Sequence, residues 1–115
     1  MGLRGHLFQS MAEAAKSVYD YYDHGNKMLF ITVMNNMSVD CDCDGNPAKP
    51  DMHDIGILAS FDPVALDQAC IDLVYAAPDS KNLIERIESR NGLLIFAHAQ
   101  EIGFGNRNYQ LKSID

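Results

Sequence analysis

The sequence predicts an α/β fold, with a small, mostly parallel or mixed sheet of about three strands packed with four helices. Two observations lead to this prediction. Segments whose apolar residues recur every three or four positions predict helices, and short apolar runs between turn residues predict strands. These segments follow the order helix, strand, long loop, strand, three helices, strand, which is typical of a layered α/β domain.

The first predicted helix extends from Leu7 to Tyr22, and its apolar residues recur at helical spacing on one stripe, which we expect to be buried. The stripe consists of Leu7, Phe8, Met11, Ala14, Ala15, Val18 and Tyr22. Gly25, just beyond it, is a typical helix stop. The segment from Met28 to Met34 is an almost unbroken apolar run. Such a run indicates a strand that is covered on both faces.

A long loop and a second strand follow. Residues 35–54 are rich in Asn, Asp, Gly, Pro and Cys, so we expect a loop, and loops of this length are often functional. Residues 55–60 predict a second buried strand. It leads into Asp62 and Pro63, which suit the N-cap and the first position of a helix.

Three helices and a last strand complete the prediction. Phe61 and Leu66 are spaced for a hydrophobic staple at the start of the first of these helices. That helix is expected to continue to Ala77 and to bury Leu66, Ala69, Cys70, Leu73 and Val74. Pro78 to Ser80 begins the next helix, which ends at Asn91-Gly92, and a short helix follows from Leu94 to Ile102. The weak alternation between Asn108 and Ile114 predicts the last strand.

Composition limits the classes of function. The 115 residues, nearly half of them apolar, are expected to form a single domain over residues 1–115. The net charge of −7 disfavours nucleic acid, which requires clustered cations. The chain has no apolar run of membrane-spanning length, and its first residues do not resemble a secretion signal, so we expect a cytoplasmic protein. The three cysteines are then expected to be thiols or metal ligands.

An acidic loop carries the candidate chemistry. Cys41 and Cys43 lie close to Asp42, His53 and Asp54, and thiolate, imidazole and carboxylate groups are the ligands of zinc and iron. A single residue between the cysteines is tighter than usual zinc spacing, so a turn at Asp42 is required. The sequence therefore predicts a divalent metal site at these five residues. The alternative is an acidic surface loop with two incidental thiols.

Other residues carry weaker signals. Cys70 lies on the buried stripe of its helix and is expected to act as a small apolar side chain. Asp67 lies off that stripe, either close to the cysteine loop or in solvent. An acid or base role for Asp62 or Asp67 stays open, so whether the chain is an enzyme is undecided. The glycines of residues 103–105 indicate a helix C-cap and a turn rather than a phosphate loop.

Four segments resemble a known family. They are Ser38 to Cys43, Asp54 to Ser60, Asp62 to Ala69, and Glu101 to Gly105. In these segments the chain resembles the carboxy-terminal part of the uncharacterised iron-sulfur center proteins, known as domain of unknown function family 362. The resemblance implies an association with iron-sulfur clusters. The ferredoxin-like run of cysteines that holds such clusters is missing here.

Two hypotheses of function follow. The first is a metal-binding or redox-associated accessory domain that uses the Cys41 and Cys43 loop. The second is a non-catalytic interaction domain that docks with a ferredoxin-like, cluster-bearing partner portion. The resemblance also implies apolar surface that a partner portion would cover, so we expect a homo-oligomer or a cluster-bearing protein partner.

Overall fold

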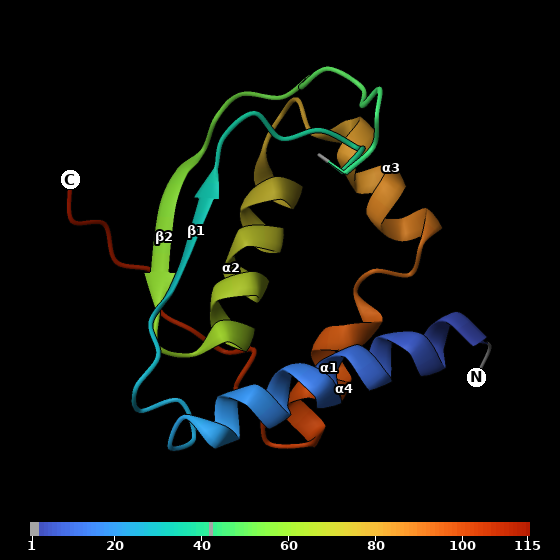
Figure 1. The fold of residues 1–115 in the computed structure, drawn as a ribbon. Coiled ribbons are helices and arrows are strands. Elements are labelled where there is room, and N and C mark those ends of the chain that lie inside the picture. The colour runs from blue at the N-terminus through green and yellow to red at the C-terminus, as the bar shows by residue number, and fades with distance from the viewer. Residues whose placement is uncertain (1–2, 42) are drawn as a thin grey trace.

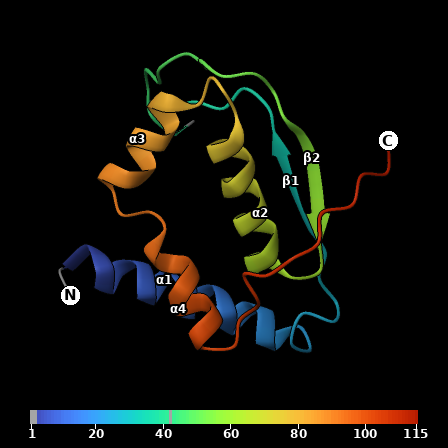
Figure 2. The same ribbon diagram turned by 180° about the vertical axis from the view of Figure 1, so that it is seen from behind.

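The computed structural model describes residues 3–41 and 43–115. Within these residues the chain forms four helices and two strands. In chain order they are α1 (Leu3–Tyr21), β1 (Phe30–Met34), β2 (Gly56–Ser60), α2 (Pro63–Ala76), α3 (Lys81–Ser89) and α4 (Leu94–Glu101) (Figure 1). Helices α1 and α4 lie side by side, and α2 extends from them along the sheet (Figures 1 and 2). The described helices include none with both the length and the apolar composition that a membrane span requires.

The sheet differs from the predicted one. The described residues form a single two-stranded sheet in which β1 and β2 are antiparallel, with Phe30 opposite Ser60 and Met34 opposite Gly56. The prediction of about three mostly parallel or mixed strands is therefore wrong. A parallel pair needs a crossover connection, usually a helix. Here the described residues between the strands, 35–41 and 43–55, contain no helix, and the chain returns beside β1, so the strands run in opposite directions.

The predicted last strand is also wrong. Residues 108–115 form neither helix nor strand, and they pass α2 and β2 and then turn away from the sheet (Figures 1 and 2). The Tyr109 hydroxyl donates a hydrogen bond to Asp72 of α2 at 2.6 Å. This contact with a helix, rather than a ladder of backbone hydrogen bonds, holds the start of the tail.

The four predicted helices are confirmed, each within a few residues of the expected bounds. At α2, Asp62 accepts hydrogen bonds from two backbone amides of the first turn, and Pro63 takes the first helical position. The proposed staple is wrong in its first member, since Phe61 is 70% exposed while Leu66 is buried. Gly25 has a φ of +82° after α1, and its N–H donates to the carbonyl of Tyr19 at 2.9 Å, as expected of a helix stop.

The core consists of two clusters on the two sides of α2. One lies between α1, α2 and α4 and contains Ala12, Val64, Phe96, Ala99 and Phe104. The other lies between α2 and the strands and contains Met34, Leu66, Cys70 and Val74. The predicted stripe of α1 is wrong as a buried face. Leu7, Met11 and Val18, which belong to the stripe, are about half exposed, whereas Ala12, which does not belong to it, is buried.

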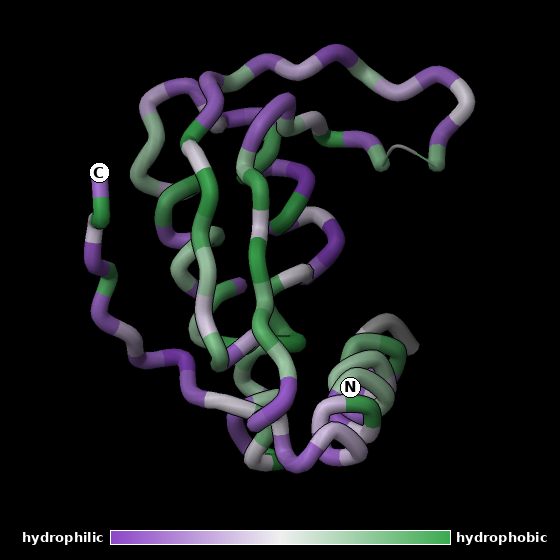
Figure 3. Tube along the Cα trace, turned by 60° about the vertical axis from the view of Figure 1, so that its left-hand side comes forward, coloured by the Kyte–Doolittle hydropathy of each residue, from purple (hydrophilic) through white to green (hydrophobic). Residues whose placement is uncertain are grey.

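One face of the sheet is not covered by any of the described residues. Phe30 and Leu58 pack against α2, and the alternate residues of both strands point away from it. We call the outward-pointing residues of both strands, together with the residue before β1 and the residue after β2, the open sheet face. It consists of Leu29 (55% exposed), Ile31 (60%), Val33 (57%), Ile57 (69%), Phe61 (70%) and the exposed Ala59. Figure 3 shows the apolar character along both strands. The prediction of a strand covered on both faces is thus wrong for this chain.

Candidate functional site

Carboxylates fix the long loop between the strands to the rest of the fold. Asp40 accepts hydrogen bonds from the Ala48 N–H at 2.8 Å and from Arg86 of α3 at 3.1 Å. The same guanidinium donates to the carbonyl of Val39 at 2.7 Å. The two hydrogen bonds to its carboxylate lower the pKa of Asp40, and the bond from the Ala48 N–H has the larger effect. Asp40 therefore serves as a structural anion that joins the cysteine loop to α3.

His53 is held at the other end of the loop. Its N–H donates to Asp79 Oδ2 at 2.7 Å, and its Nδ1 lies 2.9 Å from Asp79 Oδ1. Hydrogen bonds from His53 lower the pKa of Asp79, and the bond from the backbone N–H has a larger effect than the bond from the imidazole. Asp54 accepts a hydrogen bond from the Asn36 N–H at 2.8 Å, beside the end of β1. His53 and Asp54, which were predicted to be metal ligands, thus each form hydrogen bonds with another residue.

The two cysteines lie together in a turn. The Cys43 N–H points at Cys41 Sγ at 3.3 Å, and the Asp44 N–H donates to the carbonyl of Cys41 at 2.9 Å. Both cysteine residues are exposed. Asp42, the residue between them, lies outside the described residues. A backbone N–H directed at sulfur stabilises negative charge on that atom, which a thiolate ligand carries.

The structure brings together part of the predicted metal site. Cys41 and Cys43 are adjacent, whereas His53 and Asp54 bond elsewhere. Among residues 3–41 and 43–115, no group of three or more His, Cys, Asp or Glu side chains is placed to hold a metal ion. An iron-sulfur cluster does not fit this chain, since clusters are held mostly by several thiolates and the third cysteine, Cys70, is buried in α2. Burial and, after it, the charge of Asp67 raise the pKa of Cys70.

Two of the segments that carry the family resemblance meet at Asp62. Its Oδ1 accepts hydrogen bonds from the N–H groups of Val64 at 2.9 Å and Ala65 at 3.1 Å, which begin α2. Its Oδ2 accepts from the Asn106 N–H at 2.9 Å. Gly105 packs directly on this carboxylate, where a Cβ atom would collide with Oδ1 and lie 2.9 Å from Val64 Cβ. Both Asp62 oxygens therefore have structural roles.

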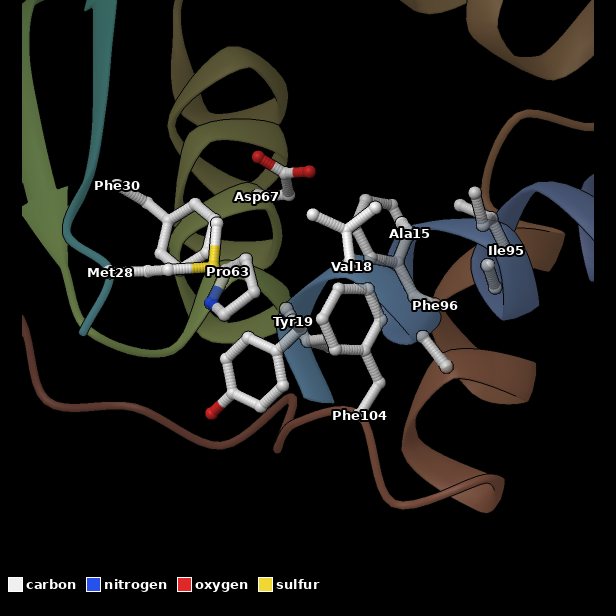
Figure 4. Close-up of a pocket in the computed structure, with 13 residues that line it drawn as sticks. Ala15, Val18, Tyr19, Met28, Phe30, Pro63, Asp67, Ile95, Phe96 and Phe104 are labelled. Atoms are coloured by element: carbon white, nitrogen blue, oxygen red, sulfur yellow. The ribbon is translucent and has the colours of Figure 1, made fainter. Parts of the chain in front are cut away.

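A cavity of about 370 Å³ lies where α1, α2 and α4 converge, and the sequence did not predict it. Most of its described lining residues are apolar, and the one charged residue among them is Asp67, which is still partly exposed (Figure 4). Burial raises the pKa of Asp67. Among the described residues, no Lys, Arg or His forms an ion pair with Asp67. The position of Asp67 off the stripe of α2 was the only signal in the sequence.

Replacing Asp67 by asparagine is expected to stabilise the fold at pH 7. Because the pKa of Asp67 is higher in the folded state than its ordinary value of 3.8, stability falls as pH rises through the interval between these two values, and the loss persists at neutral pH. The carboxylate is still partly exposed, so the expected gain is below about 1 kcal/mol.

The measurement is the melting temperature of the Asp67→Asn variant and the natural chain between about pH 3 and pH 7. The gain in melting temperature of the variant over the natural chain should shrink as the pH is lowered. Glu85→Gln, on an exposed position of α3, is the control and should leave the melting temperature unchanged. A gain that is equal at all pH values would show that ionisation of Asp67 is not its cause.

Comparison with known proteins gives one match. The family described as Domain of unknown function (DUF362) matches residues 2–72, which include α1, both strands, the cysteine loop and most of α2. The segment from Glu101 to Gly105 lies beyond this match. Neither the curated proteins nor the solved structures contain a significant match to the chain. Since the matched residues make up more than half of the sequence, the chain belongs to the DUF362 family of unknown function.

Proposed function

We propose that this chain is a non-catalytic association module that pairs with a second copy of itself through the open sheet face. The observation that carries the proposal is the exposure of five large apolar side chains on one side of the two-stranded sheet. A two-stranded sheet is marginally stable by itself and gains from packing on a second layer. Helix α2 supplies that layer on one face, and no described residue supplies it on the other.

The composition of the open sheet face favours a second copy as the occupant. None of its six residues is charged, although the chain has a net charge of −7. A partner in a twofold pair presents the same patch, so apolar side chains meet apolar side chains. Two such sheets pack about 10 Å apart with their inner side chains interdigitated.

The area is sufficient for a weak pair. Large apolar side chains gain about 2 kcal/mol each on burial at about 25 cal/mol per Å², so the five amount to on the order of 400 Å² per copy. A pair would bury about 800 Å², which is below the usual range of stable interfaces and typical of weak, transient ones. We therefore expect a dissociation constant in the micromolar range or weaker.

Sedimentation equilibrium over about 1 to 300 µM tests the proposal, since this range spans a micromolar dissociation constant. The expected result is a monomer–dimer equilibrium. It should strengthen as salt is raised, because salt screens the repulsion between two chains of charge −7. A monomer at every concentration and salt would overturn the proposal. A dimer that weakens with salt would indicate a charged interface elsewhere and would also contradict it.

A second candidate function is metal binding at the cysteine turn. The observation that favours it is the short distance from the Cys43 N–H to Cys41 Sγ, which places both residues in one turn with exposed side chains. Two thiolates supply half of a tetrahedral zinc or iron site. The predicted contributions of Asp42, His53 and Asp54 belong to this proposal, and His53 and Asp54 would have to leave their present partners to take part.

Metal content after anaerobic purification tests this candidate. The natural chain is expected to retain zinc or iron, and the Cys41→Ser/Cys43→Ser variant to lose most of it. Cys70→Ala is the control, because Cys70 is buried in α2 and should not affect the metal. Equal metal content in the natural chain and the double variant would exclude the two sulfurs as ligands.

The sequence resemblance supports further parts of the proposal. It favours placing the chain with the iron-sulfur center proteins, as the carboxy-terminal portion of a longer cytoplasmic protein. A cluster-bearing portion of such a protein would be the other occupant of the open sheet face. If a cluster-bearing portion is the occupant, the chain alone should remain monomeric in the sedimentation experiment. That result would contradict pairing with a second copy.

A further inference from the structure

We infer that the cavity between α1, α2 and α4 is a binding site for a small molecule with an apolar body and one cationic nitrogen, such as an alkylammonium ion. The site is distinct from the open sheet face. Phe30 borders the cavity from the α2 side of the sheet, whereas Ile31, the next residue, lies on the open side. The inference therefore does not depend on the proposed pairing.

The size and the lining of the cavity suit a small ligand. Its volume of about 370 Å³ falls within the usual range of small-molecule pockets. Aromatic rings form much of its wall, including those of Tyr19, Phe30, Phe96 and Phe104 (Figure 4). The rings of Tyr19 and Phe104 are edge to face, with centroids 5.2 Å apart. Aromatic faces attract cations as well as apolar groups.

One charged residue gives the cavity a preference for cationic ligands. Among the described residues, Asp67 of α2 is the only charged residue that lines the cavity, and it is still partly exposed (Figure 4). The described residues include no ion-pair partner for it, so its charge is not compensated from within the fold. An ammonium group beside this carboxylate would form a charge-assisted hydrogen bond with it, while an alkyl chain would contact the apolar wall.

Titration of the isotope-labelled chain with hexylammonium chloride tests the inference, with hexanol as the neutral probe. Methyl signals of Ala15, Val18 and Ile95, which line the cavity, report occupancy. We expect hexylammonium to bind about tenfold more tightly than hexanol, in line with a hydrogen bond to a charged group. The Asp67→Asn variant is expected to bind both probes equally, at the hexanol level.

A blocking variant separates the cavity from the surrounding surface. Ala15→Phe places a ring at the cavity wall and should abolish the shifts caused by hexylammonium. Ala14→Phe is the matched control, because Ala14 is exposed on the same helix and does not line the cavity, and it should bind normally. Equal affinity for the two probes, or shifts that persist in Ala15→Phe, would overturn the inference. The absence of any methyl shift with hexylammonium at millimolar concentration would do the same.

Discussion

Replacing Gly105 by alanine is expected to destabilise the fold by about 2–4 kcal/mol, the largest effect that we predict for a single residue. An added Cβ would collide with Asp62 Oδ1 and approach Val64 Cβ to 2.9 Å. Either the carboxylate or the backbone of residues 105–106 must move. Movement of the carboxylate breaks the cap of α2, and movement of the backbone breaks the bond from Asn106 to Asp62.

Thermal and urea unfolding measure this effect. Gly45→Ala is the matched control, because nothing lies within 4 Å of a Cβ at that position and its φ is not positive, so the melting temperature should hardly change. A loss of about 2 kcal/mol would lower the melting temperature by roughly 10 °C in a domain of this size. Equal behaviour of the two variants would refute the close approach of Gly105 to Asp62.

Introducing an ion pair on the open sheet face is expected to weaken self-association by at least a hundredfold. In the Val33→Lys/Ile57→Glu variant, the two new side chains face each other across the strands, since Val33 pairs with Ile57. Opposite charges at such a position support the hairpin. Pairing of two copies would require the removal of these charges from water, which costs several kcal/mol. The net charge of the chain does not change.

A second ion pair on α1 provides the control for this variant. Leu7→Lys/Met11→Glu also replaces two exposed apolar residues without a change in net charge, at positions four residues apart on one helix. Sedimentation should show a monomer for the sheet variant and an unaltered equilibrium for the helix variant, with unchanged circular dichroism in both. Loss of association in the helix variant alone would indicate that the interface lies on α1 and not on the sheet.

The helices were predictable because their signals are local. Asp62 and Pro63 define the start of α2 within two residues, and Gly25 and Gly103 follow the ends of α1 and α4 with positive φ. The turn at residues 103–105 was predicted as well, but the reason for Gly105 was not. Its neighbour Asp62 lies in a distant part of the sequence, and only the folded chain brings the two together.

The sheet and the site depended on non-local contacts. An apolar run such as Met28 to Met34 predicts a strand, but the direction of its partner depends on the path of the loop. Likewise, the sequence groups His53 with the cysteines, whereas the fold pairs His53 with Asp79, 26 residues away. Local composition therefore located the loop correctly and could not show which of its side chains meet.

The most direct test of the central claim is an isotope-filtered nuclear Overhauser experiment on an equal mixture of labelled and unlabelled chains. Pairing through the sheets predicts cross-peaks from the methyl groups of Ile31, Val33 and Ile57 of one copy to the Phe61 ring of the other. A dimer whose intermolecular cross-peaks come only from other surfaces, or a sample without any, would contradict it.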